Sequence, residues 1–391
     1  MNRRPRVLHV TTTDISLALL LGPQLRAFAA SGLDVLTASA PGPWVPRLRE
    51  WGIPHHPLGH ATRATAPVRD ARTLLELRSL FRRLQPDIVH THNPKPGVYG
   101  RLAARWARVP VVVNTVHGLY ALPEDPRVKR AAVYALERLA ATCSDAELVQ
   151  NPEDVDVLRR LRVPEDRLHL LGNGVDLTRF DPDRIGPARA AEVRARLGIR
   201  HDEVVCGVVG RLVWEKGYQE VFDAAARLRL AAPDVRVVVV GPFDPKGDGL
   251  TPADVARAER EAGVLHLGLR DDMEDLYAAM DVFVLASHRE GFPRAAMEAA
   301  AMGCPVVATD VRGCRQVVDD GITGLLVPVR DAAALAAAVG QLAADEPRRR
   351  RMGEAGRAKA RRDFDQQRVI DITLAVYDRL LHRTRSGAGV R

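Results

Sequence analysis

The sequence has 391 residues, of which 46% are hydrophobic and 27% charged. This composition excludes a disordered or fibrous chain, and the length suits two domains better than one, because single cores stop growing at roughly 250–300 residues. The 57 Lys and Arg residues exceed the 49 Asp and Glu residues, so the net charge of +8 indicates an anionic partner: a phosphate ligand, a nucleic acid or a membrane surface.

Cysteine usage and the N-terminus indicate a cytoplasmic protein. The four cysteines have neither CxxC spacing nor histidines at zinc spacing, so we expect no disulfide framework and no metal. Residues 1–22 resemble a signal peptide only superficially, because residues 11–14 interrupt the apolar run and no Ala-x-Ala site follows. No apolar run reaches the about 20 residues that a membrane-spanning helix needs. We expect a soluble chain, at most peripheral on the inner face of the plasma membrane.

Short β-branched runs alternate with helical patterns along the first half of the chain. Helices are expected over 15–31 and 71–84. The strands expected in this half are 6–11, 34–38, 87–91, 111–116, 146–150 and 168–171.

The second half repeats this alternation, with helices expected over 218–230 and 366–381. Its expected strands are 204–210, 235–241, 264–267, 282–286, 306–309 and 325–327. Continuous apolar strands such as VRVVVVG are typical of parallel sheets buried on both faces.

Strand–helix alternation predicts an α/β protein built from right-handed βαβ units. Two separate series of strands predict two facing Rossmann-like domains, each a doubly wound parallel sheet, over 1–180 and 181–365. Residues 366–391 would form a C-terminal helix that packs back on the first domain. Ligands of such sheets bind beyond the carboxyl ends of the strands, so the active site is expected in the cleft between the domains.

Two segments after strands of the second half carry candidate chemistry. In 210–217 (GRLVWEKG), Gly210 permits a tight turn and the cations Arg211 and Lys216 can clamp a diphosphate; a solvated basic loop is the alternative. The segment is neither a Walker loop nor a GxGxxG fingerprint.

In 290–298 (EGFPRAAME), Pro293 would open a helix whose free amides bind anions beside Glu290, and Glu298 would reach ligand hydroxyls. A capping carboxylate and a surface glutamate are the alternative.

These segments, followed by MGCPVVATDVRGCRQVVDDGITGLLV, resemble the nucleotide-sugar domain of the family 4 retaining glycosyltransferases, which have the GT-B architecture. The first half, with RVLHVTT, PDIVHTHNPKPG, NTVHGL and NGVD, resembles the subgroup that builds capsule, O-antigen and related polysaccharides. The resemblance covers nearly the whole chain.

The resemblance implies a role for individual residues. Arg211 and Lys216 would hold the donor diphosphate and stabilise it as it leaves, and Glu298 would bind the ribose hydroxyls. The residues implied to surround the donor sugar and base are Glu290, Gly291, Phe292 and Pro293, His117 from the first domain, and the loop from Leu267 to Arg270. Catalysis would rest on Glu290, Arg211, Lys216 and His117, without a metal or other cofactor.

The sequence defines the acceptor site less fully than the donor site. Many family members have a Gly-Gly loop after the first strand, where this chain has 11–16 (TTTDIS). The weak acceptor candidates are Thr12, Thr13, Asp14, Ser16 and His92. Without the family resemblance, His117 would be interpreted as a structural histidine. His90 and His92 are interpreted as core and loop residues, since no carboxylate partner for a metal is evident.

The sequence therefore predicts a retaining, metal-independent transferase that moves a sugar from a nucleotide diphosphate, expected to be a UDP-sugar, to a glycan or polyprenyl-diphosphate-linked acceptor. Apolar and basic residues in the helix at 72–84 could contact an anionic membrane, or it could be an ordinary helix with a solvated basic face. The alternatives are a transferase for a small soluble acceptor and a GT-B sugar-nucleotide epimerase. Nucleic acid is not expected as a partner, because the basic residues are dispersed.

Overall fold

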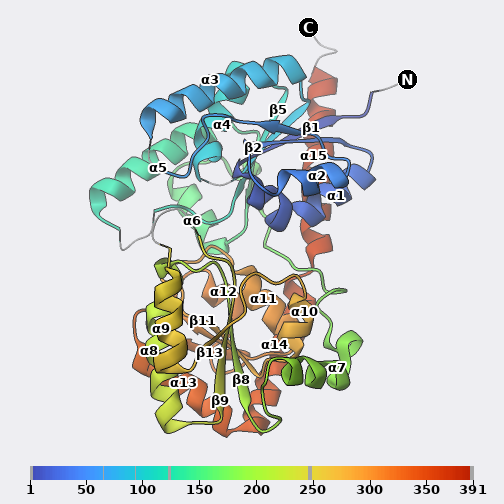
Figure 1. Cartoon of the computed structure of the whole chain (residues 1–391). Coiled ribbons are helices and arrows are strands. Elements are labelled where there is room, and N and C mark those ends of the chain that lie inside the picture. Colours follow the sequence, from blue (N-terminus) through green and yellow to red (C-terminus); the bar gives the residue numbers. More distant parts are fainter. Residues whose placement is uncertain (1–2, 65, 93, 122–124, 245–248, 388–391) are drawn as a thin grey trace. The chain divides into compact units, whose positions relative to one another are not determined.

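The computed structural model describes residues 3–64, 66–92, 94–121, 125–244 and 249–387 (Figure 1). The chain forms two compact units. The first comprises residues up to Gly172 together with those from Arg368 on, and the second comprises Asn173–Gln367.

The first unit contains a parallel sheet with the strand order β3-β2-β1-β4-β5-β6-β7. The expected strands are present with ends shifted by at most two residues, and β3 was not predicted because its three residues include a proline and no apolar run. The strands are β1 (Arg6–Thr13), β2 (Asp34–Ala40), β3 (His55–Pro57), β4 (Ile88–His92), β5 (Val111–Val116), β6 (Ala146–Val149) and β7 (Leu168–Leu170).

Helices cover both faces of this sheet (Figure 1). One face packs against a π-helix (Ser16–Leu20), α1 (Gly22–Ala30) and α15 (Gln366–Gly387). The other packs against α3 (Pro67–Leu84) and α4 (Pro94–Trp106). The helix predicted over 15–31 is thus divided before Gly22, where a glycine and a proline follow each other. The remaining helical elements of this unit are α2 (Val45–Glu50), α5 (Arg127–Ala141), α6 (Pro152–Arg160) and a 3-10 turn (Glu165–Arg167).

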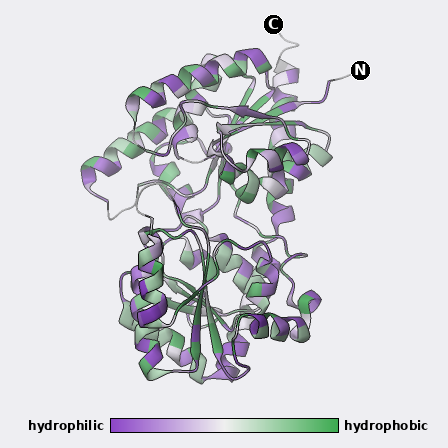
Figure 2. Cartoon of the chain, in the orientation of Figure 1, coloured by the Kyte–Doolittle hydropathy of each residue, from purple (hydrophilic) through white to green (hydrophobic). Residues whose placement is uncertain are grey.

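The second unit contains a parallel sheet with the order β10-β9-β8-β11-β12-β13. Its strands are β8 (Val204–Val209), β9 (Val235–Val240), β10 (Leu265–His266), β11 (Val282–Leu285), β12 (Val306–Thr309) and β13 (Gly324–Val327). Figure 2 shows hydrophobic residues along these strands, whereas the covering helices carry both hydrophobic and hydrophilic residues.

Two hydrophobic cores lie on opposite faces of this second sheet. One core is shared with α8 (Tyr218–Ala231), α9 (Pro252–Ala262) and α13 (Ala332–Ala344). The helices that contribute to the other core are α7 (Pro182–Arg196), α10 (Met273–Ala278), α11 (Arg294–Ala301), α12 (Cys314–Val317) and α14 (Glu346–Asp363).

The units divide after Gly172 rather than at the expected residue 180. Val175 pairs with Asp365 in a parallel bridge, and the side chain of Phe180 is buried in the core of the second unit. These contacts commit the segment to the second unit. In the C-terminal helix, by contrast, Val369, Ile370 and Tyr377 are buried in the core of the first unit.

Both sheets are doubly wound, and each has one point at which the strand order reverses. That point lies between β1 and β4 in the first sheet and between β8 and β11 in the second. Ligands of open α/β sheets bind outside the carboxyl ends of the strands at such points. Among the described residues, no helix is both long and apolar enough to cross a membrane.

Candidate active site

A glycine brings the loop after β8 against the end of β11. The loop ends in a 3-10 turn (Trp214–Lys216) and Gly217, whose φ of 74° lies in the left-handed region. A Cβ atom on Gly217 would lie 2.0 Å from the carbonyl oxygen of Ala286, at the end of β11. Glycine is therefore required here for both its conformation and its size.

Lys216 and Glu290 join the loops of these two neighbouring strands. Nζ of Lys216 donates to Oε1 of Glu290 at 2.5 Å, and Oγ of Ser287 donates to the same oxygen at 2.7 Å. The backbone N–H of His288 also donates to the carbonyl of Glu215 at 2.9 Å. The Glu290 side chain is 10% exposed and that of Lys216 is 27% exposed, so the pair is accessible mainly through its lysine.

Arg211 is paired with an aspartate that the sequence reasoning did not single out. Its Nη1 donates to Oδ2 of Asp244, in the loop after β9. The Arg211 side chain is 43% exposed, whereas Asp244 is 8% exposed. Both cations of the loop after β8 thus have carboxylate partners, and an incoming anion would share or displace them.

Glu298 lies on the second turn of α11, where it meets Tyr277. The Tyr277 hydroxyl donates to Oε2 of Glu298 at 3.0 Å, and Nε of Arg294 lies 3.7 Å from Oε1. The side chain of Glu298 is 15% exposed, and burial raises its pKa above the ordinary value although Arg294 and Tyr277 oppose the rise. Burial among hydrogen-bonding partners is what a carboxylate that binds ligand hydroxyls requires.

The start of α11 has no side-chain cap. Pro293 is the N-cap, not the first helical residue as predicted, and it makes no side-chain hydrogen bond to the helix amides. Gly291 precedes Phe292, whose ring packs edge-on against Phe364 with centroids 5.9 Å apart. The first amides of a helix that lacks such a cap are a ready site for phosphate.

The segment expected near the nucleobase follows β10. The N–H of Leu267 donates to the carbonyl of Val239 at 2.9 Å. Arg270 forms two hydrogen bonds to Asp272, from Nε at 2.8 Å and from Nη2 at 2.6 Å. A base that uses Arg270 would meet a guanidinium already oriented by Asp272.

In the first unit, His117 follows β5 and is connected to the interior by His92. Nε2 of His117 lies 3.1 Å from Nδ1 of His92, and Nε2 of His92 lies 3.0 Å from Nδ1 of His9. His92 is 1% exposed, so it presents no surface to an acceptor. Removal from water lowers the pKa of His117 to about 4, which leaves the ring neutral near pH 7.

The predicted acceptor residues after the first strand are largely enclosed, because β1 extends to Thr13. Asp14 is 5% exposed, and its carboxylate accepts the N–H groups of Ile15 at 2.9 Å and Trp44 at 2.7 Å. It therefore holds two turns together. Thr12 is 7% exposed, which leaves Thr13 and Ser16 as the more accessible pair.

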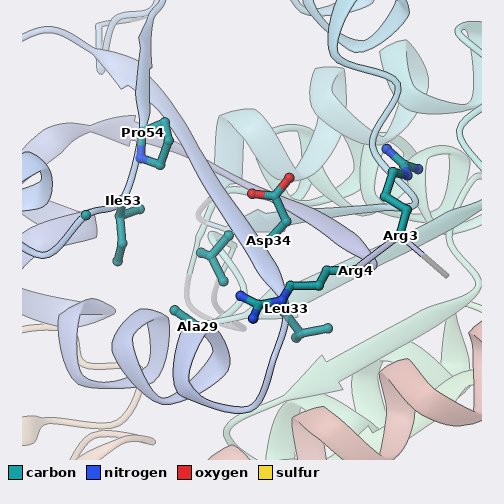
Figure 3. A pocket seen from close by; sticks show the side chains of 9 residues that line it. Arg3, Arg4, Ala29, Leu33, Asp34, Ile53 and Pro54 are labelled. Atoms are coloured by element: carbon teal, nitrogen blue, oxygen red, sulfur yellow. The ribbon is translucent and has the colours of Figure 1, made fainter. Parts of the chain in front are cut away.

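A cavity of about 390 Å³ in the first unit lies at the amino ends of its strands (Figure 3). Its lining includes Arg3, Arg4, Asp34 and Pro54. Because this is the opposite end of the sheet from His92 and His117, the cavity takes no part in the candidate site.

The second unit therefore presents two cations, the largely buried carboxylates of Glu290 and Glu298, and a helix start without a side-chain cap at the switch point of its sheet. This set suits an anionic ligand that also carries hydroxyl groups. The doubly wound fold and this site define the class of nucleotide-dependent α/β transferases.

Two family profiles match the chain. The model of the family "Glycosyl transferases group 1" matches residues 190–359, and the model of the "Glycosyl transferase 4-like domain" matches residues 21–174. The sequence is 33% identical over 270 residues to the UDP-Gal:alpha-D-GlcNAc-diphosphoundecaprenol alpha-1,3-galactosyltransferase of Escherichia coli, covering 68% of each chain. It is 35% identical over 295 residues to the D-inositol 3-phosphate glycosyltransferase of Xylanimonas cellulosilytica, covering 71% of this chain and 68% of the other.

Among solved structures, HepE of Anabaena in complex with UDP and glucose aligns with a TM-score of 0.78 at 19% identity, covering 95% of this chain and 99% of the other. The chain belongs to the family 4 glycosyltransferases and has the GT-B fold.

Proposed function

We propose that this glycosyltransferase moves a sugar from a UDP-sugar to a polyprenyl-diphosphate-linked acceptor in surface-polysaccharide synthesis, with retention at the anomeric carbon and without a metal. The E. coli relative supports both the donor and the acceptor of this proposal, because its name contains a UDP-sugar donor and a diphosphoundecaprenol-linked acceptor. The UDP and glucose bound to HepE agree with such a donor.

One observation carries the proposal: Lys216 and Glu290 meet at 2.5 Å between the loops of β8 and β11. A lysine beside an open helix start can bind a diphosphate, and a carboxylate held next to it can bind the hydroxyls of the attached sugar. Arg211 would bind the diphosphate from the other end of its loop, and Gly210, Gly291, Phe292 and Pro293 would line its path.

The remaining donor contacts follow from this placement. Glu298 would accept hydrogen bonds from the ribose hydroxyls, and the segment from Leu267 to Arg270 would contact the base. His117 would lie beside the sugar ring as a neutral imidazole.

Catalysis would be electrostatic. Negative charge grows on the departing phosphate as the glycosidic bond breaks, and Arg211, Lys216 and the amides of α11 stabilise that charge without reorganising. The acceptor oxygen attacks the anomeric carbon from the same face and passes its proton to the leaving phosphate oxygen. No side chain of this chain is required as a covalent nucleophile.

The test is a transfer assay with UDP-, GDP- and dTDP-sugars and a lipid-diphosphate-linked acceptor, with proton NMR of the anomeric centre of the product. We expect turnover with the UDP-sugar, an unchanged rate after EDTA and a retained anomer. An inverted product, or activity lost to EDTA and restored by Mg²⁺, would contradict the mechanism. Donor epimerisation without transfer would point to the epimerase alternative.

The expected membrane face on the helix over 72–84 is not available. Leu77, Leu80 and Phe81 of α3 are at most 4% exposed and belong to the core of the first unit. The apolar residues that suggested a membrane contact instead hold α3 against its own sheet.

The helix α5 supports a membrane contact better. Val128, Leu136 and Leu139 are 84%, 50% and 53% exposed, and at 100° per residue they lie within one apolar stripe. The stripe also includes three exposed alanines: Ala131, Ala132 and Ala135. Exposed Arg127 and Arg138 lie along one edge of the stripe. A basic-edged apolar helix face is suited to anionic lipid, and it would bring a polyprenyl-linked acceptor to the first unit on the inner face of the plasma membrane.

Sedimentation with liposomes that contain anionic phospholipid tests this contact. We expect the protein to sediment with them, and expect a variant with Val128, Leu136 and Leu139 changed to Gln to remain in the supernatant. A matched triple change on α3 of Val68, Leu75 and Arg72 to Gln controls for altered surface polarity. Equal sedimentation of all three proteins would exclude α5 as the contact.

A small soluble acceptor is the second candidate, because the relative from Xylanimonas is named for D-inositol 3-phosphate. Supplying inositol phosphate in place of the lipid-linked acceptor distinguishes the two, and transfer to it alone would assign the chain to the second function.

A further inference from the structure

Histidines gather at the switch point of the first sheet. His9 lies on β1, and it is the register partner of His90 on β4. His92 lies two residues further along β4, and His117 follows β5. His9, His90 and His92 are each at most 2% exposed, so the interior holds three imidazoles that the proposed mechanism does not use.

Three of the four rings form one hydrogen-bonded row. His9 contacts His92 through Nδ1 and Nε2 at 3.0 Å, and His92 contacts His117 through Nδ1 and Nε2 at 3.1 Å. His92 therefore uses both ring nitrogens on other histidines. His90 stacks on His92 with ring centroids 4.2 Å apart, but its nitrogens face Tyr377 of α15 and, at 2.7 Å, Thr115.

The row is neutral. Burial lowers the pKa of His9 to about 3 and of His117 to about 4, and it lowers the pKa values of His90 and His92 well below their usual range. Neighbouring histidines further lower the pKa values of His90 and His92, whereas a side-chain hydrogen bond with Gln150 partly opposes the lowering of the His117 pKa. A neutral imidazole has one N–H donor and one acceptor nitrogen, so the row permits only two arrangements of its protons.

His9 selects between them, because its buried Nε2 has no hydrogen-bond partner among the residues that the structure describes. If protons pointed toward His9, that Nε2 would carry a buried N–H with no acceptor. If they point away, Nε2 carries only a lone pair, and the ring of His9 is stacked with that of Phe28 with centroids 5.6 Å apart. Orphaned buried N–H groups are the rarer of the two. The favoured arrangement has His9 donating to His92, and His92 donating to Nε2 of His117.

We propose that His92, with His9 behind it, is a positioning residue that fixes His117 as its Nδ1–H tautomer and holds the ring in one orientation. The inference rests on the proposed function, which places His117 beside the donor sugar. The sugar of a glycosyl-transfer transition state resembles an oxocarbenium ion, so an imidazolium next to it would oppose the reaction. A ring held neutral and fixed in place avoids that repulsion.

A metal ion does not explain the cluster as well. Ring nitrogens of His9, His90 and His92 lie within 4.8 Å of one another, as three ligands would. However, His90 and His92 already use both nitrogens on Tyr377, Thr115, His9 and His117. A metal-bound His9 would also have a second nitrogen without the partner that histidine ligands normally have.

Two isosteric substitutions separate the two contacts of His92. In His92→Asn the amide nitrogen takes the place of Nδ1, so it keeps the donation to His117 and loses the contact with His9. In His92→Gln the amide takes the place of Nε2, so it keeps His9 and loses His117. Tyr377→Phe is the control, since it disturbs the same core beside His90 but leaves the row intact.

Long-range proton–nitrogen NMR of 15N-histidine protein reports the tautomer of His117 directly, without any need for activity. We expect Nδ1–H in the wild type, in His92→Asn and in Tyr377→Phe, and a mixture of tautomers in His92→Gln. An Nε2–H tautomer in the wild type, equal spectra for the Asn and Gln variants, or one bound metal ion per chain would overturn the proposal.

Kinetics then test the consequence for catalysis. We expect His92→Gln to lower kcat about tenfold or more with the donor KM changed less than about twofold, and His92→Asn to stay within about threefold of the wild type. A locked tautomer with equal kcat in both variants would refute the positioning role and leave the proposed function intact. If the wild type transfers no sugar, the proposed function fails while the spectra still decide the tautomer.

Discussion

The two switch points have the same topology but opposite chemistry. Between β8 and β11 the side chains are charged, with Lys216 against Glu290 and Arg211 against Asp244 nearby. Between β1 and β4 they are buried imidazoles without charge near pH 7. A diphosphate needs cations that remain partly accessible, whereas a sugar ring that becomes positive is better placed beside neutral groups. Under the proposed function, one strand order would thus serve two electrostatic purposes.

The largest expected effect at the charged switch point comes from the removal of Lys216. We expect Lys216→Ala to lower kcat by roughly a hundredfold to a thousandfold, because a positioned charge is lost from the departing phosphate. Turnover and melting temperature are measured together. Lys359→Ala, which removes a lysine paired with Asp319 elsewhere in the second unit, is the matched control. Wild-type turnover in Lys216→Ala would eliminate the phosphate role.

A change of Glu298 tests its proposed role, which is to bind the ribose hydroxyls of the donor and not the reacting groups. Glu298→Gln keeps the shape and weakens the acceptor that Tyr277 orients at 3.0 Å. We expect the donor KM to rise about tenfold with kcat little changed, as for loss of uniform binding. Tyr277→Phe should show a smaller change in the same direction. A fall in kcat at constant KM would move Glu298 from the ribose to the reacting centre.

Asp244 is expected to compete with the donor diphosphate for Arg211. Asp244→Asn would remove the ion pair with Arg211, while the size and shape of the side chain at position 244 would stay nearly the same. We expect the donor KM to fall by about twofold to threefold, since a pair that is solvent-exposed on its arginine side contributes only about 1 kcal/mol or less. Steady-state kinetics at low and at high salt measure it. A rise in KM would show instead that Asp244 orients Arg211 for the diphosphate.

The neutral switch point predicts a loss of stability in acid. The pKa values of His9 and His117 are lower in the folded chain than the ordinary 6.5, at about 3 and about 4. Protons therefore bind preferentially to the unfolded chain as the pH falls below 6.5, and stability present above 6.5 is lost on the way to about 4 for His117 and about 3 for His9. We expect melting temperature to fall by several degrees from pH 7 to pH 5. His9→Phe should flatten this dependence, and His382→Gln, an exposed position on α15, should not.

The sequence predicted most strands of both sheets because their apolar runs are continuous and bounded by turn residues. It also indicated Arg211, Lys216, Glu290 and Glu298, because a resemblance in that segment joins short motifs in a fixed order. The Lys216–Glu290 contact itself spans 74 positions and depends on β8 and β11 being neighbours.

Residues whose role depends on strand order were harder to find. His9 occurs within an apolar run and reads as a core residue until β1 is known to pair with β4. Asp244 follows β9, and nothing local in the sequence connects it to Arg211. The apolar stripe of α5 was missed because periodicity gives a helix an apolar face without revealing whether anything covers it.

The contribution of α15 to the core of the first unit has a consequence for biosynthesis. Residues 173–367 are an insertion between two parts of that unit, because Arg368 and the residues after it return to its core. During translation the second unit can close as soon as its own residues have emerged, although it comes later in the chain. The first unit must wait for Ile370 and Tyr377, with part of its sheet uncovered until then. Chaperone dependence and proteolysis of nascent chains should therefore concentrate in the first unit, and loss of α15 should damage the beginning of the protein more than its middle.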